Sequence, residues 1–294
     1  MSDKPAAANT VRSDRLDPGL YLVATPIGAA RDITLRALDI LACADVIAAE
    51  DTRTARKLME IHGIAVGGRP MQAYHDHSST GVRDKILAML SAGKSVAYVS
   101  EAGTPLVADP GYQLARAAIA ADLPVKTAPG ASAALAALCL SGLPSDRFLF
   151  AGFAPQSAGS LKSFLADLAP IRATLILYES PRRVHRLLGA LADILGEGRQ
   201  IAICRELTKH FEEVLRGTIG EVRAQIEGRV LKGEIVVVID KGEAAVVGEE
   251  ALKDALRAAL ADHSVKDAAA MVATATGLPK RQVYQAALKL DGEE

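Results

Sequence analysis

Short apolar runs alternate with segments of helical periodicity from Leu20 to about Leu143. In the helical segments, apolar residues recur at intervals of three and four, as at Leu35, Leu38 and Leu41. The apolar runs predicted to be strands are Leu20–Ala24, Asp45–Ala49, Met71–Tyr74, Ser95–Val99 and Pro124–Thr127. This alternation of strands and helices favours a mostly parallel sheet.

The same alternation restarts after Leu143, which predicts a second α/β domain. Its predicted strands are Phe148–Ala151, Thr174–Tyr178, Ile201–Cys204 and Glu234–Ile239, and its predicted helices are Leu161–Leu168, Val184–Leu195 and Gly220–Ile226. We therefore expect a disordered tail over residues 1–17, an N-terminal α/β domain over residues 18–143 and a second α/β domain over residues 144–242.

The last part of the chain, residues 249–294, has the pattern of a small helical domain after a linker at 242–248. Its predicted helices are Glu249–Ala261, Val265–Thr276 and Pro279–Leu290. Gly277-Leu278-Pro279 joins the last two in the manner of a helix-turn-helix motif. The pattern is equally consistent with a nucleic-acid-binding motif and with a plain helical cap.

Composition narrows the class of protein. Half of the 294 residues are hydrophobic, 23% are charged, and the formal net charge is −1, so a nucleic-acid partner would have to be met by local basic patches. The amino-terminal segment has no apolar core of signal-peptide type, and the richest apolar run, Ala131–Leu140, is too short to span a membrane. We expect a cytoplasmic protein with no membrane partner, and buried thiols at Cys43, Cys139 and Cys204.

Loops rich in glycine and proline follow several of the predicted strands. They are Thr25–Gly28, Ala102–Pro105, Pro129–Ser132 and Gly152-Phe153. Open α/β sheets bind ligands at the carboxyl ends of their strands, and glycine lets the backbone approach a ligand closely. Each loop taken alone is equally consistent with a tight connection that binds nothing.

Several common kinds of site are excluded. The turn after the first strand, Ala24–Gly28, lacks the Gly-x-Gly signature of dehydrogenases and of the commonest methyltransferase fold, and the chain has no Walker loop and no Gly-x-Ser-x-Gly elbow. His75-Asp76-His77 has metal-ligand residue types, but no matching third cluster accompanies it, and we expect no metal site.

Taken in order, the motifs resemble the tetrapyrrole methylase superfamily and, within it, the bacterial methyltransferases of small-subunit ribosomal RNA. The motifs are LYLVATPIGAARDITLRAL (residues 20–38), AAEDTR (48–53), VSEAGTPLVADPGY (99–112), APGASA (128–133), GFAP (152–155) and LYESPRRV (177–184). The resemblance extends from Leu20 to about Asp240 and includes the carboxy-terminal helices. This chain has Glu101 where the family commonly has aspartate, and Arg182 where it has histidine.

The resemblance implies S-adenosylmethionine bound between two α/β domains, and 2′-O-methylation of a cytidine in the decoding region of 16S ribosomal RNA. It also implies the small ribosomal subunit as partner and a homodimer. The positions that match the family's cofactor loops are Pro26, Ala102, Gly103, Thr104, Val107, Ser132, Ala133, Tyr178, Glu179 and Leu207.

Charged residues at strand ends supply candidates for catalysis and RNA binding. A ribose hydroxyl is a poor acid, so a nearby base or cation would assist its methylation. The catalytic candidates are Glu50, Arg53, Glu101 and Glu179, with Glu101 and Glu179 as first choices for a base. The candidates for phosphate contacts are Arg53, Lys57, Arg182, Arg183, Lys280 and Arg281. Two alternatives stay open: a methyltransferase of a tetrapyrrole precursor, and a non-catalytic ribosome-binding protein on the same scaffold.

Overall fold

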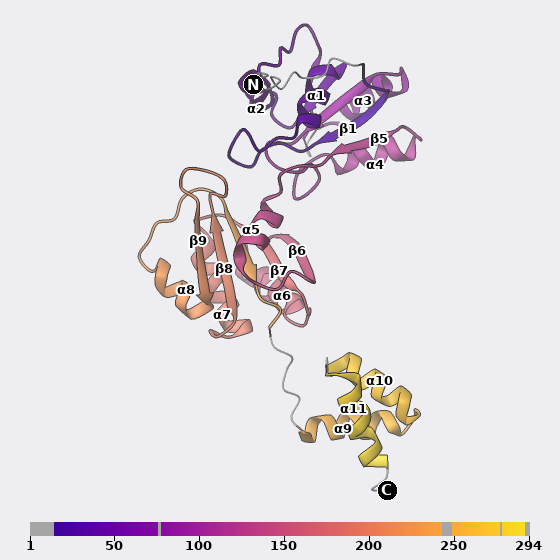
Figure 1. The fold of residues 1–294 in the computed structure, drawn as a ribbon, viewed down its shortest axis with the longest axis vertical. Coiled ribbons are helices and arrows are strands. Elements are labelled where there is room, and N and C mark those ends of the chain that lie inside the picture. The colour runs from indigo at the N-terminus through magenta and orange to yellow at the C-terminus, as the bar shows by residue number, and fades with distance from the viewer. Residues whose placement is uncertain (1–14, 76–77, 243–248, 277, 292–294) are drawn as a thin grey trace, which may run out of the picture. The chain divides into compact units, whose positions relative to one another are not determined.

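A computed structural model describes residues 15–75, 78–242, 249–276 and 278–291. The chain forms two compact units, Met1–Asp240 and Lys241–Glu294 (Figure 1). Two five-stranded sheets make up the first unit. Asp17, which the sequence analysis assigns to the tail, forms an ion pair with Lys126 at 2.9 Å. The linker over 243–248 and the residues Asp76, His77 and Gly277 lie outside the described ranges.

The first sheet is entirely parallel, as predicted. Its strands are β1 (Gly19–Val23), β2 (Val46–Ala49), β3 (Met71–Ala73), β4 (Ser95–Val99) and β5 (Val125–Ala128), in the order β3-β2-β4-β1-β5. Helices α1 (Leu35–Cys43) and α2 (Thr52–Ile61) cover one face, and α3 (Thr80–Ser91) and α4 (Tyr112–Ala120) cover the other. Burial on both faces explains why β2 and β4 are continuous apolar runs.

The second sheet is mixed, in the order β6-β7-β10-β8-β9. Its elements are β6 (Phe148–Phe153), α6 (Ala158–Leu168), β7 (Thr174–Glu179), α7 (Val184–Leu195), β8 (Gln200–Arg205), β9 (Glu213–Thr218), α8 (Ile219–Ile226) and β10 (Ile235–Ile239). Only β6 and β7 pair in parallel, and the other pairs are antiparallel.

The sequence predicts no strand between Cys204 and Gly220, and this prediction is wrong, because the structure has strand β9 there. It is an edge strand of sequence EVLRGT whose residues are only half-buried or exposed, so it carries no apolar run. At its end Thr218 accepts a hydrogen bond from the Glu221 backbone at 3.2 Å, which begins α8 with a capping box.

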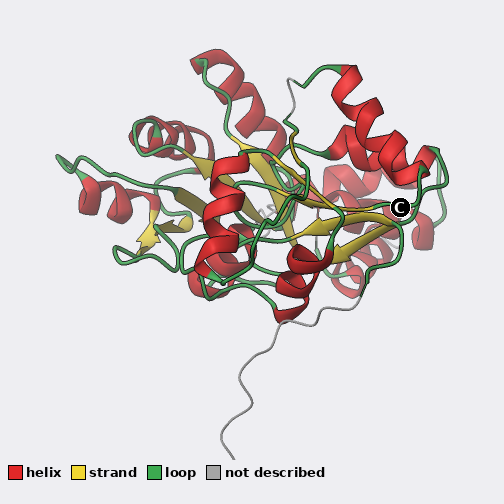
Figure 2. Ribbon diagram, turned by 90° about the horizontal axis from the view of Figure 1, so that it is seen from above, coloured by secondary structure: helices red, strands yellow, loops and turns green. Residues whose placement is uncertain are grey.

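Helix α5 (Ala133–Ser141) follows the first sheet in the chain and packs on the second. Alternate residues of the second sheet point to opposite faces: Ile176, Cys204 and Val236 pack with α5, whereas their neighbours pack with α6, α7 and α8. Helices therefore flank the strands of both sheets (Figure 2). Ile27, from the loop after β1, belongs to the same buried cluster as α5, so this cluster joins the two halves of the unit.

The unit Lys241–Glu294 contains the three predicted helices, α9 (Glu249–Leu260), α10 (Val265–Thr276) and α11 (Lys280–Asp291). They have a core of their own, centred on Leu256, Val272 and Val283. None of the helices over the described residues has the length and apolar character that a bilayer crossing requires.

The prediction of buried cysteines holds for one of the three. Cys204 is buried, Cys43 is half-buried, and Cys139 is exposed. Cys139 is exposed because α5 is apolar around its whole circumference, whereas only one side of it packs on the sheet.

Candidate functional site

A cavity of about 320 Å³ lies at the carboxyl ends of β1 and β4 and is shared by both halves of the first unit. The first half contributes small residues and backbone from three loops, and the second half contributes the ends of β6 and β7 and the start of β10. The lining residues are Ile27, 102–104, 107–109, Ser132, Ala133, Phe153, 178–181 and 233–236. The volume lies in the range of small-ligand pockets.

Most of the residues predicted to bind a cofactor line this cavity. They are Ala102, Gly103, Thr104, Val107, Ser132, Ala133, Tyr178 and Glu179. Pro26 and Leu207 are not among the lining residues; Leu207 is buried beside Ile27 in the cluster that joins the two halves. A role of these residues in binding stays a prediction.

The first-half wall is a set of loops bonded to one another. Gly103 exchanges two backbone hydrogen bonds with Thr25, at 2.9 and 3.0 Å, and the Thr104 hydroxyl donates to the Ala131 carbonyl at 2.9 Å. Leu106 and Ala108 have φ angles of 72° and 57°, a left-handed conformation that costs energy in residues other than glycine. Such strain persists only where the surroundings impose it, and here it shapes one wall of the cavity.

Ser132 and Ala133 bring the amino end of α5 to the cavity. Ser132 is the N-cap residue, yet its side chain makes no capping hydrogen bond. The first turn of a helix carries N–H groups that lack intrahelical partners and favours electron-rich ligand groups.

Glu179 is the ionisable group that is most deeply placed in the cavity wall, with 3% of its surface exposed. Its Oε1 accepts a hydrogen bond from the Ser180 backbone at 2.7 Å and pairs with Arg183 Nη2 at 2.6 Å. Its Oε2 is buried with no hydrogen-bond partner in the described structure. A buried acceptor without a donor is costly, so a ligand that offers an N–H or O–H group here would be favoured.

Tyr178 lies beside Glu179 and contacts aromatic rings of β6. Its ring centroid is 4.8 Å from that of Phe150 and 5.4 Å from that of Phe153. Burial raises the pKa of the Tyr178 phenol, so the group is held neutral.

The other catalytic candidates gather at the ends of the neighbouring strands β2 and β4. The Glu101 backbone N–H donates to Glu50 Oε2 at 3.3 Å, and Glu101 itself is exposed beside the cavity-lining Ala102. Arg53 pairs with Asp51 at 2.7 Å, and its side chain is 90% exposed. Hydrogen bonds from Arg53 lower the pKa of Asp51 to about 2. Glu179 is therefore in the cavity wall, whereas Glu50, Arg53 and Glu101 form a separate group near it.

Of the cations predicted to contact RNA, two form ion pairs with carboxylates of the protein and four are exposed on the surface. Arg183 is engaged with Glu179, and Arg53 with Asp51. Arg182 is exposed just after β7, and Lys57 is exposed on α2. In the second unit, Lys280 and Arg281 are exposed in the first turn of α11.

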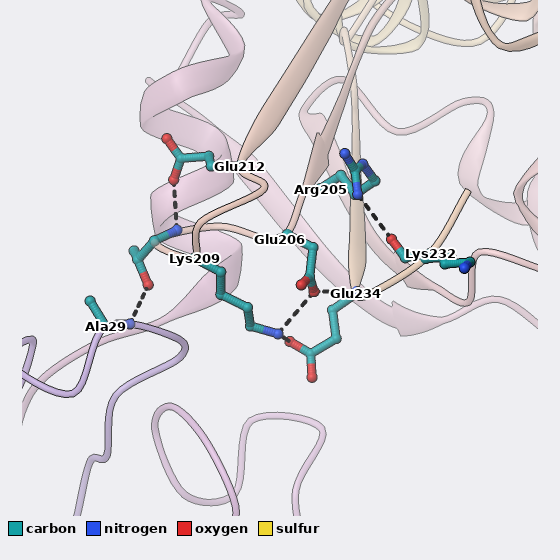
Figure 3. Close-up of polar contacts among 8 residues, drawn as sticks. Ala29, Arg205, Glu206, Lys209, Glu212, Lys232 and Glu234 are labelled. Atoms are coloured by element: carbon teal, nitrogen blue, oxygen red, sulfur yellow. Dashed lines mark hydrogen bonds and ion pairs between the residues drawn. The ribbon is translucent and has the colours of Figure 1, made fainter. Parts of the chain in front are cut away.

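The loop between β8 and β9 adds residues that the sequence analysis misses (Figure 3). Its Thr208 hydroxyl accepts a hydrogen bond from the Ala29 backbone of the first half at 3.1 Å, and the Thr208 N–H donates to Glu212 Oε2 at 2.6 Å. Lys209 pairs with Glu206 and Glu234, each at 2.9 Å. Glu234 lines the cavity, so this loop bonds to the first half through Ala29 and to the cavity wall of the second half through Glu234.

The conformation of this loop explains why the sequence points to Leu207 by resemblance alone and does not reveal Glu206 or Thr208. Glu206 and Thr208 have φ angles of 50° and 62°. Neither residue type favours the left-handed region, and a β-branched residue rarely adopts it. Hydrogen bonds from the Glu234 backbone and from Lys209 lower the pKa of Glu206 and so hold its carboxylate charged. Tertiary contacts, which a single sequence does not display, impose the conformation.

A family model for tetrapyrrole (corrin/porphyrin) methylases matches residues 19–223, and a model for the RsmI C-terminal HTH domain matches residues 246–291. The ribosomal RNA small subunit methyltransferase I of Mesorhizobium japonicum is 46% identical over 94% of this chain and 93% of its own. That of Synechocystis sp. is 42% identical over 93% of this chain and 99% of its own. The chain belongs to the ribosomal RNA small subunit methyltransferase I family of tetrapyrrole methylases.

The resemblance inferred from the ordered motifs is therefore confirmed. The fold agrees with that of the uroporphyrin-III C-methyltransferase of Thermus thermophilus in complex with S-adenosyl homocysteine, with a TM-score of 0.50 and 20% identity over 75% of this chain and 96% of that one. Within the described ranges of the present chain, which do not include Asp76 and His77, no three or more His, Cys, Asp or Glu side chains form a group that could hold a metal.

Proposed function

We propose that the protein transfers a methyl group from S-adenosylmethionine to ribosomal RNA of the small subunit, and that the acceptor is the ribose 2′-hydroxyl of a cytidine in the decoding region. The observation that carries the proposal is the shared cavity, whose walls are the loops that hold the family's motifs. The acceptor nucleotide and its 2′-oxygen rest on the family resemblance alone. A substrate in the ribosome implies that the protein works in the cytoplasm.

The residues present fit S-adenosylmethionine. Ala102, Gly103 and Ala133 leave room for a nucleoside close to the backbone, and the start of α5 offers N–H groups to its polar atoms. The buried Oε2 of Glu179 lacks a donor, which the ammonium or a hydroxyl of the ligand would supply.

When bound, S-adenosylmethionine supplies a methyl group that its sulfonium has already activated. The loops of the chain then act mainly by holding the two reactants in line and by excluding water. Glu179 is suited to anchoring, because its Oε1 is engaged with Arg183 and Ser180 and its burial keeps it from solvent. Glu101, exposed at the end of β4 beside the cavity, is the better placed acceptor for the proton of the ribose hydroxyl.

Exposed cations would bring the RNA to the cavity. Arg182 follows the strand end that carries Tyr178 and Glu179, so its guanidinium is suited to a backbone phosphate near the reacting nucleotide. Lys57 is exposed on α2, and Lys280 with Arg281 would give α11 a contact of its own with RNA. A match to a C-terminal helix-turn-helix model supports RNA over a tetrapyrrole precursor as the substrate.

We also propose a homodimer that buries the outer face of α5. Leu135 is 49% exposed, Leu140 is 37% exposed, and Cys139 between them is exposed. Such adjacent apolar side chains on a helix favour association. Leu135→Asp should therefore lower the mass measured by light scattering from that of a dimer to that of a monomer. A wild-type protein that is monomeric at micromolar concentration would contradict the proposal.

The function is tested by incubating the protein and S-adenosylmethionine with small ribosomal subunits that lack the modification, and then mapping methylated nucleotides by mass spectrometry. A single cytidine that gains a methyl group on its ribose is the expected result. Methylation of a base, methylation of a corrin precursor but not of RNA, or no methyl transfer at all would each refute it.

A further inference from the structure

Phe153 is an aromatic side chain that lines the cavity and yet stays mostly in solvent. It is the last residue of β6, and 56% of its surface is exposed. Its ring meets that of Tyr178 edge to face, with centroids 5.4 Å apart and an interplanar angle of 70°. A residue that is exposed to this extent and also lines the cavity lies at its mouth.

The backbone around Phe153 holds it in this place. The pairing of β6 with β7 shifts register between Phe150 and Gly152, and Gly152 has a φ angle of 73°. Bulges of this kind redirect a side chain and are common next to functional sites. The two residues that follow Phe153 are also held in place: the buried Ala154 donates its N–H to the Tyr178 carbonyl at 3.4 Å, and the Pro155 carbonyl accepts from Arg186 at 3.4 Å.

The two walls of the cavity differ in chemistry. Small residues and loop backbone line the cavity on the side of the first half, whereas the second half places Phe153 at its exposed rim. Proteins recognise single-stranded RNA by stacking splayed-out bases on aromatic side chains. A ribose can reach a buried methyl donor only if its nucleotide leaves the RNA stack and enters through the mouth, so its base passes the rim.

We infer that Phe153 is the stacking platform for the nucleobase of the nucleotide that receives the methyl group. The inference rests on the proposed function, because it takes RNA as the substrate. The exposed Arg182, four residues after Tyr178 on the neighbouring strand end, supplies a cation for the phosphate of the same or an adjacent nucleotide. Phe153 thus adds an RNA-binding residue at the cavity, where the sequence suggests only charged candidates.

The test compares Phe153→Ala and Phe153→Trp with Phe148→Ala as the matched control. Phe148 is the first residue of the same strand and is 44% exposed, so its loss removes a similar ring at the opposite end of β6. Binding to unmodified small ribosomal subunits is measured by filter retention, and binding of S-adenosylhomocysteine by calorimetry. Circular dichroism verifies that each variant is folded.

Loss of a stacking ring should weaken the binding of subunits by Phe153→Ala by roughly 5- to 150-fold. Phe153→Trp and Phe148→Ala should bind subunits like the wild type, and all variants should keep the wild-type affinity for S-adenosylhomocysteine. Equal subunit binding by Phe153→Ala and Phe148→Ala overturns the inference. So does a loss confined to S-adenosylhomocysteine, which would assign the ring to the adenine of the methyl donor. A wild-type protein that binds neither ligand refutes the proposed function itself.

Discussion

Replacing Thr208 by valine tests whether the loop between β8 and β9 joins the two halves at the cavity. Valine keeps the size and branching of threonine but removes the hydroxyl that accepts a hydrogen bond from the Ala29 N–H at 3.1 Å. That N–H is half-buried and would lose its partner. The neighbouring Ile27 lines the cavity, so a loosened loop should also weaken ligand binding.

The size of the effect follows from the lost hydrogen bond. An intramolecular hydrogen bond contributes about 1 kcal/mol, and a buried donor left without a partner costs about 1–3 kcal/mol. Because Ala29 is only half-buried, we expect the free energy of unfolding to fall by about 1–2 kcal/mol. If the same free energy is needed to reorder the loop on binding, the dissociation constant for S-adenosylhomocysteine rises by roughly 5- to 30-fold.

Urea unfolding followed by circular dichroism gives the first quantity, and isothermal titration calorimetry the second. Thr208→Ser keeps the hydroxyl and should restore both values. Thr218→Val is the control, since it removes the N-cap of α8 and costs about 1 kcal/mol at a site that does not line the cavity. A Thr208→Val variant that binds S-adenosylhomocysteine like the wild type, or a Thr218→Val variant that weakens binding equally, would refute this role of the Thr208 hydroxyl.

Three further results are expected. Glu101→Gln should lower the single-turnover methylation rate by about 10²- to 10⁴-fold at unchanged affinity for S-adenosylhomocysteine, and an unchanged rate would rule out Glu101 as the base. Hydrogen bonds from Arg229 and Arg205 lower the pKa of Glu213 below its ordinary 4.5, so its contribution to stability is complete above that pH and is lost as the pH falls through the lowered pKa. Urea midpoints of Glu213→Gln should accordingly depend less on pH below about 4.5 than those of the wild type, and parallel curves would exclude this cause. Cys139 should react quickly with a thiol reagent in the folded Leu135→Asp variant, whose α5 face the proposed dimer no longer covers, whereas the buried Cys204, with its pKa raised to about 11, should react only after unfolding; equal rates would contradict the described burial.

The sequence predicts most of the fold because burial on both faces makes strands such as β4 and β10 continuous apolar runs. It misses β9, an edge strand of polar sequence, because the edge of a sheet does not require an apolar run. It also misplaces Cys139, since an all-apolar helix such as α5 does not reveal which side is covered.

For the candidate site, the ordered motifs identify the loops that line the cavity, including Thr104, Ser132 and Glu179. They do not identify Thr208 or Glu206, because long-range hydrogen bonds to Ala29 and Glu234 impose their left-handed backbone. The sequence does not reveal ion pairs either, because they too depend on tertiary contacts. Arg183 is suggested as a phosphate ligand by its position in the chain, but the fold places its guanidinium on Glu179.

The proposed function requires one ligand site between the two halves, and a titration of S-adenosylmethionine into three proteins tests that requirement most directly. Ala133 and Ala158 are each the first residue of a helix, but Ala133 lines the cavity whereas Ala158 is exposed on α6. The wild type and Ala158→Phe should bind one ligand per chain with equal affinity, and Ala133→Phe, whose ring would fill the cavity, should show no saturable heat. Undiminished binding by Ala133→Phe would place the methyl donor elsewhere and contradict the account.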